Sequence, residues 1–175
     1  GVQATVLDAA PVLDAGQTLA VANPRVLALS QATIHLLKTV KVWDKLARQM
    51  PYSGMQVWNK NGYGDINFGQ VSVHTPSDEQ ALGSMVEPSV LNLAIQEKML
   101  EQLHDYRTNV QVTRVEQGID VWHIHLADGT QLSTKLVIGA DGANSFVREQ
   151  AFIALDVLDY KQAGLTCAIR TAQPH

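Results

Sequence analysis

Apolar and polar residues alternate in several short stretches of the chain and recur at helical spacing in others. Alternation with a period of two predicts strands, and apolar residues three or four positions apart predict helices. The pattern predicts a strand over residues 2–7 and a loop over residues 9–22. The further elements that it predicts are a helix from 23 to about 40, a hairpin within 53–68, a helix from about 87, a strand over 110–115, a hairpin over 121–138, a helix over 145–151 and a strand over 165–170.

Capping signals mark where the two longer helices are expected to begin. Asn23-Pro24 combines a favoured N-cap residue with a residue suited to the first helical position. An apolar stripe follows, and Val42 and Trp43 are expected to pack just beyond that helix. Glu87-Pro88-Ser89 gives a similar start to the second helix, whose stripe is Leu91, Ala94, Ile95, Met99 and Leu103.

Strand–helix units mixed with antiparallel hairpins predict an α/β fold with a mixed sheet. Asn61-Gly62 is a strong hairpin signal between MQVW and DINF. The chain begins with a strand-like run and ends just after another one. Because a severed strand leaves unpaired backbone groups, we expect this chain to be a piece of a longer protein and its open sheet edges to favour self-association.

Composition narrows the class of protein. The 175 residues are 46% hydrophobic and 17% charged, with a formal net charge of −4. Such a charge gives no basic field for nucleic acid, so no nucleic-acid partner is expected. The sequence contains no apolar run of the length that a membrane span needs. A lone cysteine, Cys167, fits a reducing compartment, so a cytoplasmic location is expected.

Two Asp-Gly pairs stand close together and predict different structures. Asp128-Gly129 lies between two alternating runs, as a tight hairpin turn requires. Asp141-Gly142 instead follows the apolar run 136–138 and precedes a helix start at Asn144 or Ser145. A strand, a glycine-containing bend and a helix N-terminus can turn backbone N–H groups toward a ligand. From the residues alone, a ligand site and an ordinary loop capped by Asp141 are about equally favoured.

Residues 136–148 (LVIGADGANSFVR) closely resemble the Asp-Gly fingerprint of FAD-dependent aromatic hydroxylases of the para-hydroxybenzoate hydroxylase type. The hydroxylases of bacterial ubiquinone biosynthesis are the nearest likeness. Residues 24–46 resemble the arginine-containing helix of that family, residues 84–95 its V-E-x-x-x-L segment, and residues 159–175 the strand after its fingerprint. This last segment most resembles the polyprenylphenol hydroxylase that oxygenates ring carbon five.

The resemblance implies a partial Rossmann-like FAD-binding domain and part of an antiparallel substrate-domain sheet. Residues 1–50 and 87–152 would belong to the FAD-binding domain, and residues 51–86 and 153–175 to the substrate domain. The family's upstream GxGxxG strand and its later Gly-Asp motif have no counterpart in these 175 residues. We therefore expect the isolated chain to bind FAD weakly or not at all and to be inactive by itself.

The resemblance also implies roles for individual residues at the cofactor. Asp8, at the end of the first strand, would bind the adenosine ribose, and Asp141 the ribityl chain. The expected FAD-binding residues are Asp8, Arg25, Glu87, Gly139, Asp141, Gly142 and Arg148. NAD(P)H would be the electron donor and a polyprenylated phenol the substrate. Such a substrate implies peripheral contact with the inner membrane or with a biosynthetic complex. No catalytic or metal-binding residue is nominated.

Each of these side chains also has a purely structural interpretation. Asp8 would be a solvated aspartate at a strand end, and Glu87 would cap a helix. Arg25 would face solvent, although a cation in the first turn of a helix opposes the macrodipole and a bound pyrophosphate would offset that cost. Arg148 would pair with Glu149 or Asp141.

The remaining candidates are interpreted structurally. Residues 62–67 (GYGDIN) are one glycine short of GxGxxG and predict a turn. His123 and His125 share one strand face without a nearby third ligand, which favours a solvated pair over a zinc site. Cys167 is expected in the core. Two rival functions remain open: another flavoenzyme of this scaffold, such as a prenyl reductase or halogenase, or a non-catalytic module that retains the fold.

Overall fold

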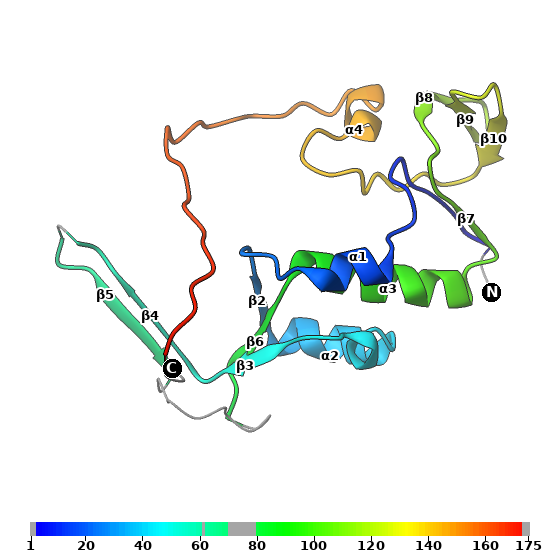
Figure 1. Ribbon diagram of the computed structural model, residues 1–175. Coiled ribbons are helices and arrows are strands. Elements are labelled where there is room, and N and C mark those ends of the chain that lie inside the picture. The colour runs from blue at the N-terminus through cyan, green and yellow to red at the C-terminus, as the bar shows by residue number, and fades with distance from the viewer. Residues whose placement is uncertain (1–2, 61, 70–79, 173–175) are drawn as a thin grey trace. The chain divides into compact units, whose positions relative to one another are not determined.

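This computed structural model describes residues 3–60, 62–69 and 80–172 and divides into two compact units. Unit 1 comprises residues 1–12 and 103–163, and unit 2 comprises residues 13–102 and 164–175 (Figure 1). Each unit combines strands with at least one helix, so the predicted mixture of α and β elements is confirmed. The four-part domain division stays a prediction.

Unit 1 contains two small sheets. β1 (Thr5–Leu7) pairs in parallel with β7 (Asp105–Arg107). β8 (Val112–Gln117), β9 (Trp122–Leu126) and β10 (Gln131–Thr134) form an antiparallel sheet of order β10-β9-β8.

The core of unit 1 lies on one face of the three-stranded sheet. Alternation along β8 and β9 places Val115, Ile124 and Leu126 on the same side, and all three are buried. The short helix α4 (Phe146–Gln150) packs against β8, where the Gln150 side chain accepts a hydrogen bond from the Val115 backbone at 3.4 Å.

Unit 2 is built on the antiparallel sheet β2-β6-β3, formed by Leu27–Ser30, Gly83–Val86 and Met50–Tyr52. Helices α2 (Gln31–Thr39) and α3 (Pro88–Gln102) follow β2 and β6 directly (Figure 1). The buried cluster between these elements consists of Leu29, Ile34, Leu37, Val42, Val86 and Ala94, with Trp43 packed against it. Each fully buried aliphatic side chain contributes roughly 1.5–3 kcal/mol to folding.

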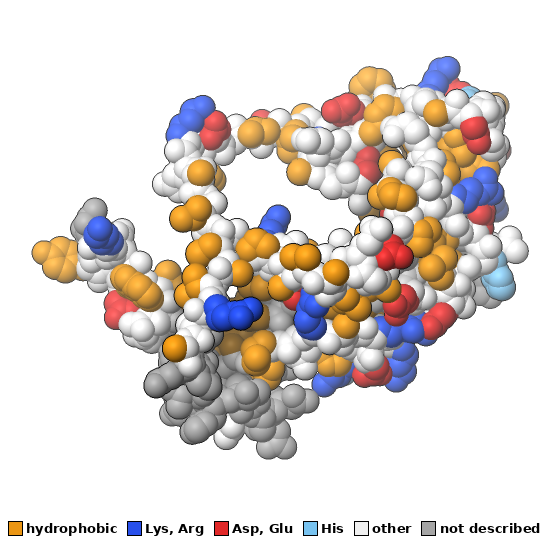
Figure 2. Space-filling model, viewed as in Figure 1, with side chains coloured by type: hydrophobic (Ala, Val, Ile, Leu, Met, Phe, Trp, Pro, Cys, Tyr) orange, Lys and Arg blue, Asp and Glu red, His pale blue; other side chains and the backbone are white. Residues whose placement is uncertain are grey.

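The smaller elements of unit 2 are α1 (Ala15–Ala20), the 3-10 helix η1 (Trp43–Lys45) and the hairpin of β4 (Gly54–Trp58) and β5 (Asp65–Gly69). The hairpin is confirmed at its predicted place, although Asn61 lies outside the described residues. Its pairs Met55–Phe68 and Val57–Ile66 share one face, and Val57, Ile66 and Phe68 are at least half exposed. Hydrophobic side chains are visible there in Figure 2.

Two predicted boundaries near the start of unit 2 are wrong. The helix expected from Asn23 begins only at Gln31, where the Ser30 hydroxyl accepts a hydrogen bond from the Thr33 backbone at 3.4 Å. Residues 27–30 form a strand because β6 offers them a backbone partner, and this pairing outweighs the helical spacing of their apolar residues. Part of the predicted loop 9–22 is helix α1, whose N-cap is Asp14.

Two predicted strands are also absent from the described part of the chain. Residues 136–138 and 165–170 have no ladder partner there, and the side chains of Leu136, Ile138, Leu165 and Ile169 are largely exposed. Cys167 is exposed as well, so its prediction as a core residue is wrong. An apolar run alone does not make a strand, because its backbone groups need partners in another strand.

Candidate functional site

The bend after residue 138 is held together by hydrogen bonds to Asp141. One carboxylate oxygen accepts a hydrogen bond from the Ser145 hydroxyl, and the other accepts one from the Val147 backbone N–H at 3.1 Å. Ser145 is the N-cap of α4, and its side chain accepts from the Arg148 backbone at 3.1 Å. The Asp141 side chain therefore fixes the loop to the first turn of the helix, as the capping interpretation predicted.

The electrostatics of Asp141 follow from these contacts. Burial by itself raises the pKa of the Asp141 carboxyl, but the Ser145 hydroxyl and the backbone N–H groups of Val147, Asp141 and Phe146 together hold it below its ordinary value. Hydrogen bonds to the charged form stabilise that form. Asp141 is consequently a carboxylate at neutral pH, and the residue is exposed.

Gly139 and Gly142 shape the same loop for different reasons. Gly142 has φ +89°, a backbone conformation that glycine adopts without strain. No atom lies within 4 Å of where its Cβ would be, so the surface beside it is open. A Cβ on Gly139 would lie 3.0 Å from Val147, so this glycine allows α4 to approach closely.

Arg148 completes the loop. Its guanidinium donates to the Ala143 carbonyl oxygen at 2.9 Å. No ion pair to Glu149 or Asp141 is among the contacts in the described part of the chain, so the two predicted pairings are not seen. The structure thus brings Gly139, Asp141, Gly142 and Arg148 together in one loop–helix element.

Asp8 lies directly after β1 in the same unit, where the sequence placed it. Its carboxylate accepts the Ala10 backbone N–H at 2.9 Å and the Tyr106 hydroxyl at 3.5 Å. A carboxylate offers about four acceptor positions, so Asp8 retains capacity to bind hydroxyl groups. Tyr106 is a neighbour that sequence reasoning missed, because β7 joins β1 only in the folded chain.

The first Asp-Gly pair is a turn, as predicted. The Leu126 backbone N–H donates to the Thr130 carbonyl at 2.9 Å across the three-residue loop 127–129. Gly129 has φ +86°, and the Asp128 carboxylate accepts the Thr130 backbone N–H at 2.8 Å. This pair closes the β9–β10 hairpin, whereas the pair at 141–142 leads into a helix.

Arg25 lies in unit 2, in the irregular segment between α1 and β2. The prediction that it sits in the first turn of a helix is wrong, and with it the argument from the helix macrodipole. The residue is exposed, and its backbone N–H donates to the Asn23 side chain at 2.9 Å. The solvent-facing interpretation and a role in binding an anion both remain compatible with this position.

Glu87 immediately precedes α3, and its carboxylate is held by several donors. Arg48 donates from Nε at 2.8 Å and from a terminal nitrogen at 3.1 Å, and the Asn23 backbone donates at 2.7 Å. The hydrogen bonds from Arg48, more than any other contact, lower the pKa of the Glu87 carboxyl. Sequence reasoning missed Arg48, because no local signal joins residues 39 positions apart.

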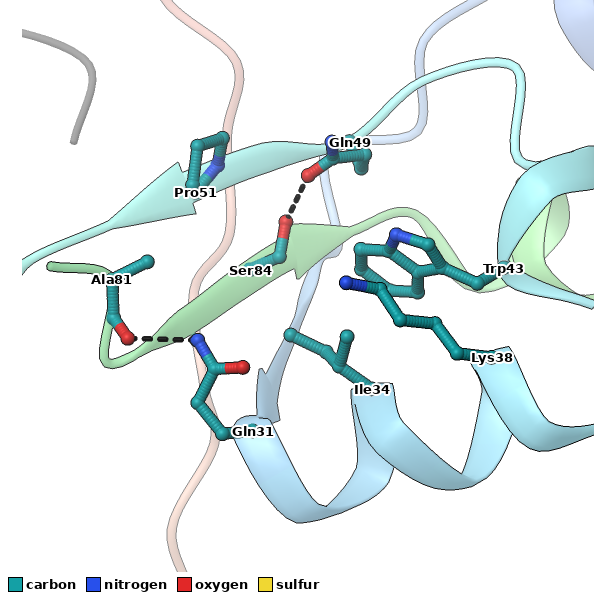
Figure 3. A pocket seen from close by; sticks show the side chains of 9 residues that line it. Gln31, Ile34, Lys38, Trp43, Gln49, Pro51, Ala81 and Ser84 are labelled. Carbon is teal, nitrogen blue, oxygen red and sulfur yellow. Dashed lines mark hydrogen bonds between the residues drawn. The ribbon is translucent and has the colours of Figure 1, made fainter. Parts of the chain in front are cut away.

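A small cavity of about 20 Å³ lies in unit 2 between α2 and the sheet (Figure 3). The Ser84 hydroxyl donates to Gln49 at 2.5 Å, Gln31 donates to the Ala81 carbonyl at 2.8 Å, and the Lys38 amine lies 6.0 Å from the centre of the Trp43 ring. This volume suffices for about one water molecule. The cavity is therefore too small to hold a cofactor.

The two histidines of β9 make polar contacts on the sheet face opposite the core. His125 Nε2 lies 3.0 Å from a Glu116 oxygen, and His123 Nδ1 lies 3.0 Å from the Ser133 hydroxyl. Within residues 3–60, 62–69 and 80–172, no group of three His, Cys, Asp or Glu side chains is arranged to hold a metal ion. The same part of the chain has no helix that is long and apolar enough to cross a membrane.

The predicted residues could contact a ligand in two ways, through hydrogen-bond acceptors and through a positive charge. Asp8 and Asp141 offer carboxylate acceptors for hydroxyl groups, and the open backbone at Gly142 permits close approach of a ligand. Arg25 offers an exposed cation for an anionic group. The acceptors of unit 1 suit a ligand with sugar hydroxyls, and the cation of unit 2, taken by itself, suits an anionic group such as a phosphate.

Comparison with known proteins agrees with this chemistry. A family described as FAD binding domain matches residues 1–166. The chain is 33% identical over 165 residues to the ubiquinone biosynthesis monooxygenase COQ6, mitochondrial, of Danio rerio. The aligned region covers 87% of this chain and 33% of that protein. It is 30% identical over 151 residues to 3-demethoxyubiquinol 3-hydroxylase of Escherichia coli K12, with coverage of 83% and 37%.

A solved structure with a similar fold is that of a PqsL mutant from P. aeruginosa. It superposes with a TM-score of 0.63 at 20% sequence identity and covers 89% of this chain and 41% of that one. At such identity the likeness concerns the fold alone. The chain spans about a third of the length of the curated relatives that it matches.

Proposed function

This chain belongs to the FAD binding domain family, and we propose on that basis that the full-length protein is an FAD-dependent monooxygenase of ubiquinone biosynthesis. Its substrate would be a polyprenylated phenol, hydroxylated on the ring. The relatives that carry the names of ubiquinone-pathway hydroxylases support this assignment. The likeness of residues 159–175 to the corresponding hydroxylase favours ring carbon five as the position of attack.

The observation that carries the proposal is the loop–helix element of Asp141. Its carboxylate is charged and held in place by Ser145 and Val147, while Gly142 leaves the adjoining surface open. A carboxylate of this kind accepts hydrogen bonds from sugar hydroxyls. In the proposal Asp141 holds the ribityl chain of FAD, Asp8 the adenosine ribose and Arg25 the phosphates.

When bound, FAD supplies the redox chemistry of the hydroxylation, with NAD(P)H as the proposed reductant and oxygen as the source of the hydroxyl group. The residues of this chain contribute binding and orientation. Asp8, Asp141 and the backbone near Gly142 fix the position of the cofactor. No residue of this chain is assigned a chemical step.

The proposal is tested on the purified full-length protein. We expect one FAD per chain in a fluorescence titration, and NAD(P)H oxidation that a polyprenylated phenol stimulates more than the same phenol without its chain. Analysis of the product by mass spectrometry and NMR identifies the hydroxylated carbon. A protein that binds no FAD, or binds it without hydroxylating any phenol, would contradict the proposal.

The isolated 175-residue chain provides a second comparison. We expect it to bind FAD at least a hundredfold more weakly than the full-length protein, because the family's upstream glycine-rich motif would be missing. This factor corresponds to a loss of binding free energy on the order of 3 kcal/mol. Light scattering should detect association of the chain through open sheet edges. For the full-length protein, we expect flotation with vesicles because a polyprenyl chain resides in the membrane.

A further inference from the structure

An ion pair between Arg48 and Glu87 lies beside the irregular segment 21–26 of unit 2. The guanidinium approaches the carboxylate with two nitrogens, Nε at 2.8 Å and a terminal nitrogen at 3.1 Å. Such two-point contact fixes orientation as well as distance. The Glu87 side chain is only 12% exposed and that of Arg48 37%, so the pair lies partly within the protein.

Each member of the pair also binds the backbone of a segment distant in the sequence. Arg48 donates from its remaining terminal nitrogen to the Leu19 carbonyl at 2.8 Å. Glu87 accepts the Asn23 backbone N–H at 2.7 Å. The ion pair therefore holds the chain at two points four residues apart, one in the last turn of α1 and one in the segment before β2.

The contacts continue from Asn23 to Arg25. The side-chain oxygen of Asn23 accepts the Arg25 backbone N–H at 2.9 Å, which fixes a local turn around Pro24. The Arg25 side chain is exposed, and the structure gives it no protein partner among the described residues. A continuous series of contacts thus runs from Arg48 through Glu87 and Asn23 to the backbone of Arg25.

The same contacts argue against Glu87 as a direct ligand. Three of the roughly four acceptor positions of its carboxylate are filled, two by the Arg48 guanidinium and one by Asn23, and its side chain is only 12% exposed. A ligand hydroxyl would have to compete with charged donors that are already in place. Glu87 is better suited to hold the protein backbone than to contact a cofactor.

We propose that Arg48 is a positioning residue, which acts through Glu87 and Asn23 to hold Arg25 where it meets the phosphates of FAD. This inference rests on the proposed function, because it requires FAD as the ligand of Arg25. It extends that function to Arg48, which contacts no cofactor itself, and it changes the role of Glu87 from ligand to support.

A double-mutant cycle in the full-length protein tests the inference. FAD affinity is measured by flavin fluorescence for the wild type, Arg48→Met, Arg25→Met and the double variant. We expect Arg48→Met to weaken binding about tenfold, the size of one lost hydrogen bond at its upper range. If Arg48 acts through Arg25, adding Arg48→Met to the Arg25→Met protein should weaken FAD binding by no more than about another twofold.

Asn23→Ala tests the same series of contacts without breaking the ion pair, and it serves if Arg48→Met does not fold. It removes only the side-chain acceptor of the Arg25 N–H, since the Asn23 backbone N–H to Glu87 is retained. We expect several-fold weaker FAD binding with little change in the melting temperature. Lys45→Met is the matched control, because the Lys45–Glu101 pair lies in the same unit and, among the described residues, makes no hydrogen bond or ion pair with residues 21–26.

The outcomes separate this inference from the proposed function. A wild-type protein that binds no FAD refutes the proposed function and the inference with it. If the wild type binds FAD, additive effects of Arg48→Met and Arg25→Met would overturn the inference alone. It would equally be overturned if Asn23→Ala bound FAD as tightly as the wild type, or if Lys45→Met weakened binding as much as Asn23→Ala.

Discussion

The two Asp-Gly glycines allow a matched test of which loop meets the cofactor. Gly142 and Gly129 have nearly the same backbone conformation, φ +89° and φ +86°. Neither has any atom within 4 Å of the position that a Cβ would take. Alanine at either site therefore meets no steric obstacle, and its cost comes from backbone conformation alone.

The expected magnitude follows from that conformation. An L-residue held at positive φ costs roughly 1–2 kcal/mol. We expect Gly129→Ala to lower the free energy of unfolding by an amount within this range, because the paired strands of its hairpin hold the turn in place. Gly142→Ala should lower it by less, because the exposed loop at Gly142 can relax in the free protein. If FAD requires the loop in its strained conformation, binding must restore that conformation in Gly142→Ala. The energy of doing so reduces the binding free energy, so Gly142→Ala should weaken FAD binding about 5- to 30-fold.

The assay combines chemical denaturation with FAD titration on the full-length protein and both variants. Gly129→Ala should reduce stability while leaving FAD affinity within about twofold of the wild type, because its turn only reverses the chain. The reasoning is refuted if Gly142→Ala binds FAD like the wild type. It is also refuted if both variants lose affinity equally, since the effect would then be general destabilisation.

Two further predictions concern stability. Asp141→Asn removes a carboxylate whose pKa is lowered in the folded state. The contribution of this carboxylate to stability is present above its ordinary pKa of 3.8 and is lost as pH falls through the folded-state pKa. Denaturation should therefore show the variant about 1 kcal/mol less stable at pH 7, with the difference shrinking below pH 3.8, and a difference that does not change with pH would contradict this reasoning. The buried side chain of Gln96 accepts a hydrogen bond from the Leu13 backbone N–H at 2.7 Å and donates one to the Leu13 carbonyl at 3.1 Å. Gln96→Leu should therefore lower the free energy of unfolding, measured by urea denaturation, by about 2–3 kcal/mol. Gln102 is exposed on the same helix, and Gln102→Leu should change the free energy of unfolding by less than about 0.5 kcal/mol. Equal losses of stability in the two variants would exclude the role assigned to Gln96.

Elements with strong local signals were predictable from the sequence. Pro88 and the apolar stripe behind it marked helix α3, and Asn144-Ser145 marked the start of α4, whose N-cap is Ser145. The Asp128-Gly129 turn was identified because its glycine conformation and its flanking strands depend on neighbouring residues only. The mixed α/β class followed from the same local patterns, and the Asp-Gly fingerprint at 141–142 indicated the family.

Contacts between distant residues decided the rest. Residues 27–30 became a strand because β6 pairs with them, although their apolar spacing suited a helix. Residues 165–170 have strand-like alternation, yet they meet no partner within the described chain and stay exposed. The sequence by itself determined turns, caps and helix faces, since these depend on interactions over a few residues. Only the tertiary structure paired Arg48 with Glu87 and Tyr106 with Asp8, because hydrogen bonds across 39 and 98 positions leave no periodic trace in a sequence.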